Sequence, residues 1–282
     1  MDAEPSLPLV SVVTPSLNQG AFIEETIRSV LEQDYPRIEH IVVDGGSTDE
    51  TIGVLRRHPH LRWISEPDRG QADAVNKGFQ MARGAIFGWL NSDDLYVPGA
   101  IRAAVELIME SKCGLVHGGW RRIDAEGRTI NEVPAVAFDL RRQLDYANLV
   151  AQPGALFTRE AFEAVGGLDV SYRYAMDYEL FLRIGKRFDV RHIDRVLGAY
   201  RYHPESKTVA ESSGFVDETF HAARAHGARI RSRMVLDYYL PRRRPWLFRF
   251  LRGYRFLRSG DFAAFRARVT SHAARAFRRA AS

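Results

Sequence analysis

Residues 9–49 read LVSVVTPSLNQGAFIEETIRSVLEQDYPRIEHIVVDGGSTD, and their pattern decides the fold. Two runs rich in β-branched residues, 9–13 and 38–43, are typical of buried strands. Between them, residues 21–33 place apolar side chains at helical spacing. A strand, a helix and a second strand in this order predict two parallel strands joined by a crossover helix.

The same alternation continues along the chain. Further strands are expected at 61–65 and 85–90. Three more helices are expected: one begins near residue 48, one follows the loop at 66–70 and ends at residue 81, and one begins near residue 98. After Cys113 the pattern is less regular, with expected strands at 115–123, 152–157 and 191–202 and helices at 159–165 and 177–186. We therefore predict an α/β fold with a Rossmann-like, mostly parallel central sheet and helices on both faces.

Composition excludes several classes of protein. The chain has 282 residues, of which 45% are hydrophobic and 27% charged, a globular rather than a disordered composition. A single cysteine forbids an intrachain disulfide and a metal site built on several thiolates. Residues 1–8 lack the cationic and apolar runs of a leader peptide, and no stretch is apolar enough to span a membrane. We expect a cytoplasmic protein.

Polar, acidic turns follow four successive strands, at 14–18, 44–49, 66–69 and 92–94. One acidic turn after a strand often does no more than cap the next helix. In an open parallel sheet, however, ligands bind outside the carboxyl ends of the strands. Four such turns at one edge of the sheet predict a polar cleft.

The neighbouring carboxylates Asp93 and Asp94 are the most specific feature of that edge. They repel each other unless a cation lies beside them, and a hard cation such as Mg²⁺ or Mn²⁺ prefers oxygen ligands. The alternative is a solvated turn that caps the following helix. The chain has no glycine-rich phosphate-binding motif, so phosphate charge would be met by the metal and by Arg69, Lys77 and Lys207.

Several of these motifs together resemble the inverting family 2 glycosyltransferases, whose catalytic domain has the GT-A fold. The matching segments are LVSVVTPSLN at 9–18, VVDGGSTD at 42–49, EPDRGQADAVNKG at 66–78, LNSDD at 90–94, and GGLD at 166–169 followed by AMDYELFLR at 175–183. The resemblance covers roughly residues 8–208.

The resemblance implies a role for each matching position. Asp177 would be the general base, with Glu179 as the alternative. Asp94 would hold the divalent metal, Mn²⁺ or Mg²⁺, and His203 would complete that site. The residues implied to bind the donor are Thr14, Pro15, Asp44, Asp68, Asp73, Lys77, Ser92 and Asp93.

The implied activity is the metal-assisted transfer of a sugar, with inversion, from a nucleotide-diphosphate sugar to a hydroxyl of a glycan or lipid-linked acceptor. One alternative is a sugar-phosphate nucleotidyltransferase, but that class needs a glycine-rich basic loop, and residues 15–20 offer one glycine and no cation. The other is a nucleotide-sugar or glycan-binding module without turnover. Such a module would be expected to lack at least one of Asp93, Asp94 and Asp177.

The charge distribution divides the chain into a catalytic domain, 1–212, and a basic helical extension, 213–282. From Arg229 onward there are 15 arginines and only 2 acidic residues. Amphipathic helices are expected at 247–257 and after Asp261. They could bind an anionic membrane surface, which would place the protein on the inner face of a membrane, or pack on the domain. No nucleic-acid-binding motif is present, and we expect no nucleic-acid partner.

Overall fold

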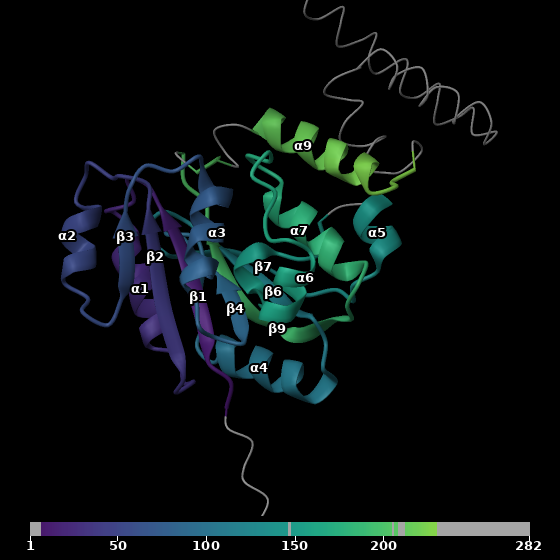
Figure 1. Ribbon diagram of the computed structural model, residues 1–282, viewed down its shortest axis with the longest axis horizontal. Coiled ribbons are helices and arrows are strands. Elements are labelled where there is room, and N and C mark those ends of the chain that lie inside the picture. Colours follow the sequence, from purple (N-terminus) through teal and green to yellow (C-terminus); the bar gives the residue numbers. More distant parts are fainter. Residues whose placement is uncertain (1–6, 146–147, 205, 208–211, 230–282) are drawn as a thin grey trace, which may run out of the picture. The chain divides into compact units, whose positions relative to one another are not determined.

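The computed structural model describes residues 7–229, except 146–147, 205 and 208–211 (Figure 1). These residues belong to one compact unit that ends at Arg229. The predicted helices of the basic extension lie outside the described residues, so the contact with a membrane stays a prediction. The predicted domain boundary at residue 212 also stays a prediction. Within the described part, no helix is long and apolar enough to cross a membrane.

A sheet of nine strands forms the centre of the described unit. Its order is β3-β2-β1-β4-β8-β6-β9-β5, with β7 paired to β6. The strands are β1 (Val10–Ser16), β2 (Ile38–Asp44), β3 (Arg62–Ser65), β4 (Ile86–Trp89), β5 (Leu95–Tyr96), β6 (Leu115–Ile123), β7 (Thr129–Val133), β8 (Ala155–Thr158) and β9 (Val190–Arg201).

Six of the nine strands run in the same direction. Strands β1 to β4 pair in parallel with one another, and β6 pairs in parallel with β9. Strand β8 lies between the two groups and is antiparallel to both β4 and β6, so β6 and β9 point the same way as β1 to β4. Strands β5 and β7 are antiparallel to their neighbours. The carboxyl ends of the six parallel strands therefore share one edge, the upper edge in Figure 1.

Helices cover both faces of the sheet. Successive side chains of a strand point to opposite faces, so a strand that is apolar throughout needs a covering layer on each face. Val12 belongs to a cluster with α1 and α4, whereas Val13 belongs to a cluster with α3, α6 and α7. The helices are α1 (Ile23–Leu31), α2 (Thr51–Arg56), α3 (Gln71–Met81), α4 (Ala100–Ser111), α5 (Leu140–Asp145), α6 (Arg159–Ala164), α7 (Met176–Gly185) and α9 (Ser212–Ala225). The predicted α/β fold with both faces covered is confirmed.

The second half of the unit departs from the predicted elements. The strand predicted at 152–157 begins only at Ala155, because Gln152–Gly154 form a short 3-10 helix. Pro153 has no N–H group to donate to a neighbouring strand, and the Gln152 side chain instead donates to the Trp89 carbonyl. Strands β5 and β7 and helix α5 were not predicted.

Candidate functional site

Asp44 ends β2 and organises the turn that follows. Its Oδ2 accepts hydrogen bonds from the Gly46 and Ser47 backbone N–H groups at 3.0 and 2.9 Å, and from Ser65 Oγ at 2.7 Å. Its Oδ1 accepts from the Ser47 hydroxyl. The side chain is fully buried, so in this state Asp44 holds the turn and the end of β3 together.

Thr14 and Pro15 lie in β1, next to β2. Thr14 Oγ1 is 2.9 Å from His40 Nε2, and both side chains are buried. Burial and the nearby His60 and His58 lower the pKa of His40 to about 3, so this histidine is neutral. The side chain of Thr14 is therefore engaged within the sheet, and Pro15 is also buried.

Asp68 lies against the turn of β2. A Cβ added to Gly45 would come within 2.8 Å of Asp68 Oδ2, so only glycine allows this close approach. Asp68 Oδ1 also accepts from the Gly70 N–H at 2.8 Å, which directs the chain into α3. The Asp68 carboxylate is thus fixed beside the Asp44 turn.

Asp73 and Lys77 lie one turn apart on α3. Arg69 donates to Asp73 Oδ1 through Nη2 at 2.7 Å, and this hydrogen bond is the largest cause that lowers the pKa of Asp73. Lys77 Nζ donates to Glu66 Oε1 at 2.9 Å and lies 3.7 Å from Asp73 Oδ2. The hydrogen bond to Glu66 is the largest cause that raises the pKa of Lys77. Both predicted side chains border the same edge.

Asn91 is the centre of a hydrogen-bond network in the loop after β4. Its Oδ1 accepts from Gln71 Nε2 at 2.7 Å and from Trp89 Nε1 at 2.9 Å. Its Nδ2 donates to Asp94 Oδ2 at 3.1 Å and to Gln152 Oε1 at 3.0 Å. One asparagine therefore ties the loop to α3, to β4 and to the segment before β8.

Asp94 is fully buried, and both of its carboxyl oxygens have partners. Oδ1 accepts from the Arg201 backbone N–H at 3.0 Å, and Oδ2 accepts from Asn91. Burial, together with the neighbouring Asp93, raises the pKa of Asp94 well above its usual range. The hydroxyl of Thr26 donates to the Asp94 carbonyl at 2.8 Å and to that of Ser92, itself buried, at 2.9 Å. Both carboxyl oxygens of Asp94 are therefore engaged within the protein.

Asp93, in contrast, keeps its carboxylate partly exposed at the edge. Its Oδ2 lies 3.1 Å from His203 Nε2, and the side chains are 18% and 4% exposed, respectively. The His203 ring also packs on Phe22, with ring centroids 4.6 Å apart. The structure thus pairs His203 with Asp93, whereas the sequence prediction paired it with Asp94.

Arg201 explains how this loop is held, and sequence analysis missed it. The side chain is fully buried at the end of β9. Its guanidinium donates to the carbonyls of Asp93 and Ala125 at 2.9 and 2.8 Å and to Glu25 Oε2 at 2.6 Å. One arginine thereby joins β9, the loop after β4, the β6–β7 hairpin and α1.

Asp177 lies in the first turn of α7 and is half-buried. Burial raises the pKa of its carboxyl group to about 6, against the lowering effect of its own and the Tyr178 N–H groups and of Asn148. Asn148 Nδ2 donates to Asp177 Oδ2 at 3.4 Å. A carboxylate with a pKa in this range can accept a proton near neutral pH.

Glu179, the alternative base, is occupied by other contacts. Arg183 donates to both of its carboxyl oxygens, at 2.7 and 2.6 Å, and His226 Nε2 lies 3.0 Å from Oε1. Burial alone would raise the pKa of Glu179, but the hydrogen bonds from His226 and Arg183 lower it. Asp177 is therefore the better placed of the two to take up a proton.

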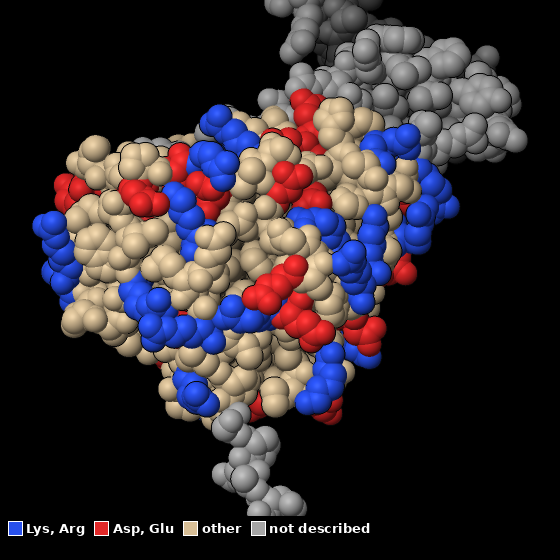
Figure 2. Space-filling view, viewed as in Figure 1, with Lys and Arg blue, Asp and Glu red and all other residues tan. Residues whose placement is uncertain are grey.

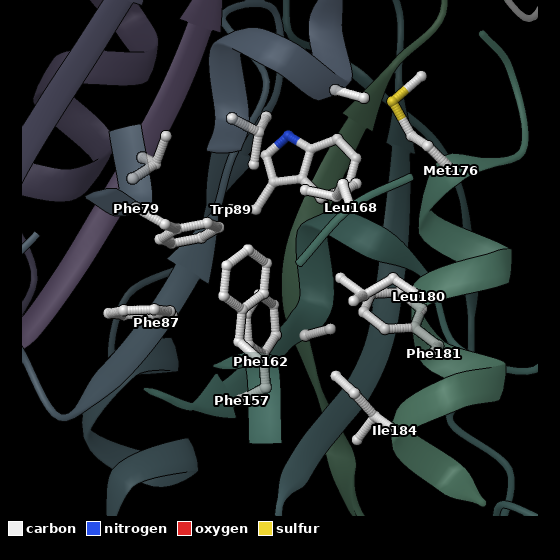
Figure 3. Close-up of a cluster of buried hydrophobic side chains, with 14 of the residues drawn as sticks. Phe79, Phe87, Trp89, Phe157, Phe162, Leu168, Met176, Leu180, Phe181 and Ile184 are labelled. Atoms are coloured by element: carbon white, nitrogen blue, oxygen red, sulfur yellow. The ribbon is translucent and has the colours of Figure 1, made fainter. Parts of the chain in front are cut away.

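Two connections bring Asp177 near the loop after β4. Asn148 contacts Asp177, and Gln152 contacts Asn91. Residues 148 and 152 are four positions apart in the chain, so their Cα atoms lie at most about 14 Å from each other. Trp89 and Met176 belong to one buried cluster, at the upper end of the cluster in Figure 3. Because these two residues lie just before the loop and Asp177, the core itself holds the two features together.

Lys207 places a cation at the same edge. Its Nζ donates to Gln71 Oε1 at 2.8 Å, and Gln71 in turn donates to Asn91. The residue as a whole is exposed, but burial of its ammonium group lowers its pKa, while Asp68 and Asp93 act in the opposite direction. Figure 2 shows acidic and basic groups close together over the ends of β2, β3 and α3.

Of the residues that sequence analysis missed, Asn91 had a local signal, because it begins the polar run that follows a predicted strand. Gln71 lies inside the matched segment 66–78 but was not singled out, and Asn148 and Arg201 had no local signal, since their partners lie 29 and 176 residues away. Among the described residues, no group of three or more histidine, cysteine, aspartate or glutamate side chains could hold a metal ion. Where the sequence predicted a metal, the described part of the chain brings Asp93 and His203 together as candidate ligands.

Comparison with known sequences gives one family. The sequence profile of the family described as "Glycosyl transferase family 2" matches residues 11–166. An uncharacterised glycosyltransferase of Mycobacterium tuberculosis is 35% identical over 186 residues, which cover 63% of this chain and 69% of that protein. A chondroitin synthase of Escherichia coli is 28% identical over 72% of this chain, which spans only 30% of the length of that relative.

Solved structures show the same fold. Residues 1–349 of TarS of S. aureus, in complex with UDP, superpose with a TM-score of 0.60 at 16% identity, covering 83% of this chain and 71% of that TarS chain. A mannosyltransferase of Pyrobaculum calidifontis in complex with GDP-Man and Mn²⁺ gives a TM-score of 0.54 at 21% identity, covering 80% and 76%. The predicted GT-A fold is confirmed.

Proposed function

The chain belongs to glycosyl transferase family 2, and from that premise we propose that it transfers a sugar, with inversion, from a nucleotide-diphosphate sugar to a hydroxyl group. The observation that carries the proposal is a half-buried carboxylate with a raised pKa, Asp177, close to the Asp93–His203 pair. A family match favours transfer over the nucleotidyltransferase considered from the sequence. The acceptor that we propose is a glycan or a lipid-linked sugar.

We place the nucleotide at the edge formed by β1 to β4. The turn of Asp44, with Asp68 against it, borders the base and ribose, while Asp73 and Lys77 line the same side. We place Lys207 nearer the diphosphate, because the charges of the Asp68 and Asp93 carboxylates act on the pKa of its ammonium group. Ser92 contributes through its backbone position, since its side chain is buried.

For the divalent metal we propose Asp93 and His203 as ligands, in place of Asp94. One carboxylate oxygen and one imidazole nitrogen, 3.1 Å apart, suit Mn²⁺ or Mg²⁺, which commonly keeps few protein ligands alongside water and substrate phosphates. Asp94 fits less well, because both of its oxygens are committed inside the protein. A bound metal would supply Lewis-acid stabilisation of the charge that develops on the leaving diphosphate.

The chain's own residues carry out the proton transfer. The acceptor oxygen forms a bond to the anomeric carbon as the bond from that carbon to the diphosphate oxygen breaks. The acceptor oxygen attacks from the side opposite the leaving group, so the configuration at the anomeric carbon inverts. The acceptor proton passes to the Asp177 carboxylate on that same side. Asn148 orients Asp177 through its amide group. Below a pH of about 6 the base becomes protonated and turnover falls.

Thermal unfolding of the full chain with nucleotides tests the proposal. UDP, GDP, dTDP and CDP are each added with Mn²⁺ and, separately, with EDTA. One diphosphate should stabilise the protein only with metal, by about 2.7 kcal/mol at a hundred times its dissociation constant. UDP and GDP are included because solved structures of this fold contain UDP-GlcNAc and GDP-Man. If none of the four stabilises the protein with metal, the transferase assignment of this edge fails and the binding-module alternative returns.

The matched control for the metal is a pair of variants, Asp93→Asn and Asp94→Asn. Asp93→Asn should abolish the metal-dependent part of the stabilisation and leave the melting temperature of the free protein nearly unchanged. Asp94→Asn should lower the melting temperature of the free protein, since Asp94 is fully buried among its partners. The opposite pattern would return the metal to Asp94.

A further inference from the structure

One carboxylate of helix α9 binds the backbone just before α7. Glu218 accepts hydrogen bonds from three consecutive backbone N–H groups, those of Arg173, Tyr174 and Ala175, at 3.0, 2.6 and 3.0 Å. The second carboxyl oxygen shares the Arg173 N–H at 3.0 Å. These donors lie immediately before α7, 43 to 45 residues away along the chain.

Ala175, the N-cap residue of α7, has no side chain that can accept a hydrogen bond. The Asp177 and Tyr178 N–H groups interact with the Asp177 carboxylate itself, so the donors that need a partner from elsewhere are those of the segment that enters the helix, Arg173 to Ala175. A carboxylate is well suited to the role, because negative charge at a helix N-terminus is stabilised by the helix dipole and by charge-assisted hydrogen bonds. Glu218 is that partner.

The close approach of α9 is a second, independent observation. A Cβ added to Gly214, one turn before Glu218, would come within 2.6 Å of the Tyr174 ring. The glycine therefore lets the helix lie directly on the segment that Glu218 binds. Figure 1 shows α9 over α7 and α5.

Contacts beyond α9 fix its far end. His226 bonds to Glu179 of α7 and lies 2.8 Å from Lys186 Nζ. Arg229 donates to the Asp145 carboxylate at the end of α5. The helix is thus held at Glu218, in its middle, and just beyond its C-terminal end, by contacts with α7 and with the end of α5.

Asp177 is the second residue of α7, so the direction of its side chain depends on the first turn of that helix. Met176 is buried in the core and fixes one side of the turn, and Asn148 contacts the carboxylate itself. Glu218 fixes the remaining element, the backbone that enters the helix. A shift of about 1 Å in a reacting group can cost on the order of 100-fold in rate.

We infer that Glu218 is a positioning residue for sugar transfer: by binding the backbone before α7, it holds Asp177 where the acceptor hydroxyl arrives. The inference rests on the proposed role of Asp177 as the base. It makes α9 part of the catalytic machinery, although α9 lies outside the segment that matches the family profile, 11–166.

The test uses the full chain with Glu218→Ala and Glu218→Gln. The control variant is Glu110→Ala, which removes an exposed glutamate from α4. Release of nucleoside diphosphate from UDP-GlcNAc and from GDP-mannose gives kcat and KM, and hydrogen–deuterium exchange follows the peptide that spans 172–177. Glu218→Ala should lower kcat at least tenfold, leave the donor KM within twofold and speed exchange of that peptide at least tenfold.

Glu218→Gln should recover much of kcat, because its amide oxygen still accepts from the same N–H groups; this rescue separates positioning from loss of folding. Glu110→Ala should change none of these quantities. If Glu218→Ala leaves either the exchange or kcat unchanged, the inference is wrong. Asp177→Asn is measured alongside: if it retains turnover, the proposed base is wrong, whereas loss in Asp177→Asn with normal Glu218 variants overturns only the role of Glu218.

Discussion

The two sides of the candidate site hold their carboxylates in different ways. On the side of β1 to β4, the partners are mostly local: Asp44 binds N–H groups two and three residues away, Asp68 binds one two residues away, and Asp73 binds Arg69. On the side of α7, Asp177 depends on Asn148, 29 residues distant, and the helix start depends on Glu218.

Under the proposed mechanism, the difference would separate donor binding from proton transfer. Turns whose carboxylates bond mostly to nearby backbone groups give a rigid surface that depends less on distant residues, which suits recognition of a nucleotide. A base whose orientation depends on remote elements can be impaired without any change to that surface. Substitutions on the two sides should therefore affect different measured quantities.

The largest expected effect is on turnover in Asp177→Asn. An amide cannot take up the acceptor proton, so kcat should fall by about 10² to 10⁴-fold. Nucleotide affinity should stay within twofold, because the local turns of β1 to β4 are untouched. Initial rates and nucleotide-dependent melting temperatures measure the two quantities on the same preparation.

Glu179→Gln is the matched control for that substitution. It weakens the ion pairs with Arg183 and His226 and should lower stability, but it should leave turnover of the folded protein largely intact. Turnover that survives in Asp177→Asn and is lost in Glu179→Gln would exchange the two assignments.

The same contrast explains what the sequence could predict. The strands and turns of 9–94 follow from runs of apolar residues and from turn residues a few positions apart, and most of the predicted donor-side residues lie at the shared edge. Asp177 was predicted as the base through its motif, and this role stays a prediction. Its supports were not predicted, because no local pattern tells Asn148 or Glu218 which distant group it will meet.

The assignment of the metal to Asp94, which stays a prediction, did not take the burial of that residue into account. Asp93 and Asp94 are adjacent in sequence and chemically identical, so sequence alone offers no way to choose between them. The fold distinguishes them through Arg201. Its backbone N–H donates to the buried carboxyl group of Asp94, whereas its guanidinium donates to the backbone carbonyl of Asp93. The short strand β5, only two residues long, leaves equally little pattern to detect.

Arg201→Met should give the next largest effect, because Arg201 joins the loop after β4 to β9, the β6–β7 hairpin and α1. The carbonyls of Asp93 and Ala125 would lose their donors in a buried environment. We expect a loss of about 2–4 kcal/mol in the free energy of unfolding, measured by urea denaturation. Arg102→Met, which removes a partly exposed ion pair with Asp34, should cost no more than about 1 kcal/mol. Equal losses in the two variants would contradict the role of Arg201.

The pH dependence of stability isolates the burial of Asp177. Its pKa in the folded protein, about 6, is above the ordinary value of 3.8, so the fold favours the neutral carboxyl group. This contribution is fully present below pH 3.8 and is lost as pH rises through 6. Between pH 4 and pH 8 the wild type should therefore lose about 2 kcal/mol more than Asp177→Asn, which cannot ionise. Parallel stability curves for the two proteins would show that the carboxyl group is not desolvated.

Gly78→Ala tests the packing that carries the donor side. Gly78 lies on α3 against β1, and an added Cβ would come within 2.3 Å of Val13 Cγ1. Because the branched Val13 side chain is fully buried and cannot move freely, we expect a loss of about 1–3 kcal/mol in unfolding free energy. Lys77 and Asp73 share this helix, so nucleotide affinity should fall with it while the pH profile of kcat, which reports Asp177, keeps its shape.

Gly53→Ala gives the smallest effect, and with the opposite sign. Gly53 lies inside α2, which also packs against β2, but an added Cβ meets nothing within 4 Å. Alanine therefore brings only its higher helix propensity and the smaller entropy of its unfolded chain, which together raise the free energy of unfolding by about 0.5–1 kcal/mol. Turnover and nucleotide affinity should not change, since no side chain of the site touches this position. A loss of turnover in Gly53→Ala would mean that α2 moves during the reaction, and the donor side could then no longer be described as a rigid surface.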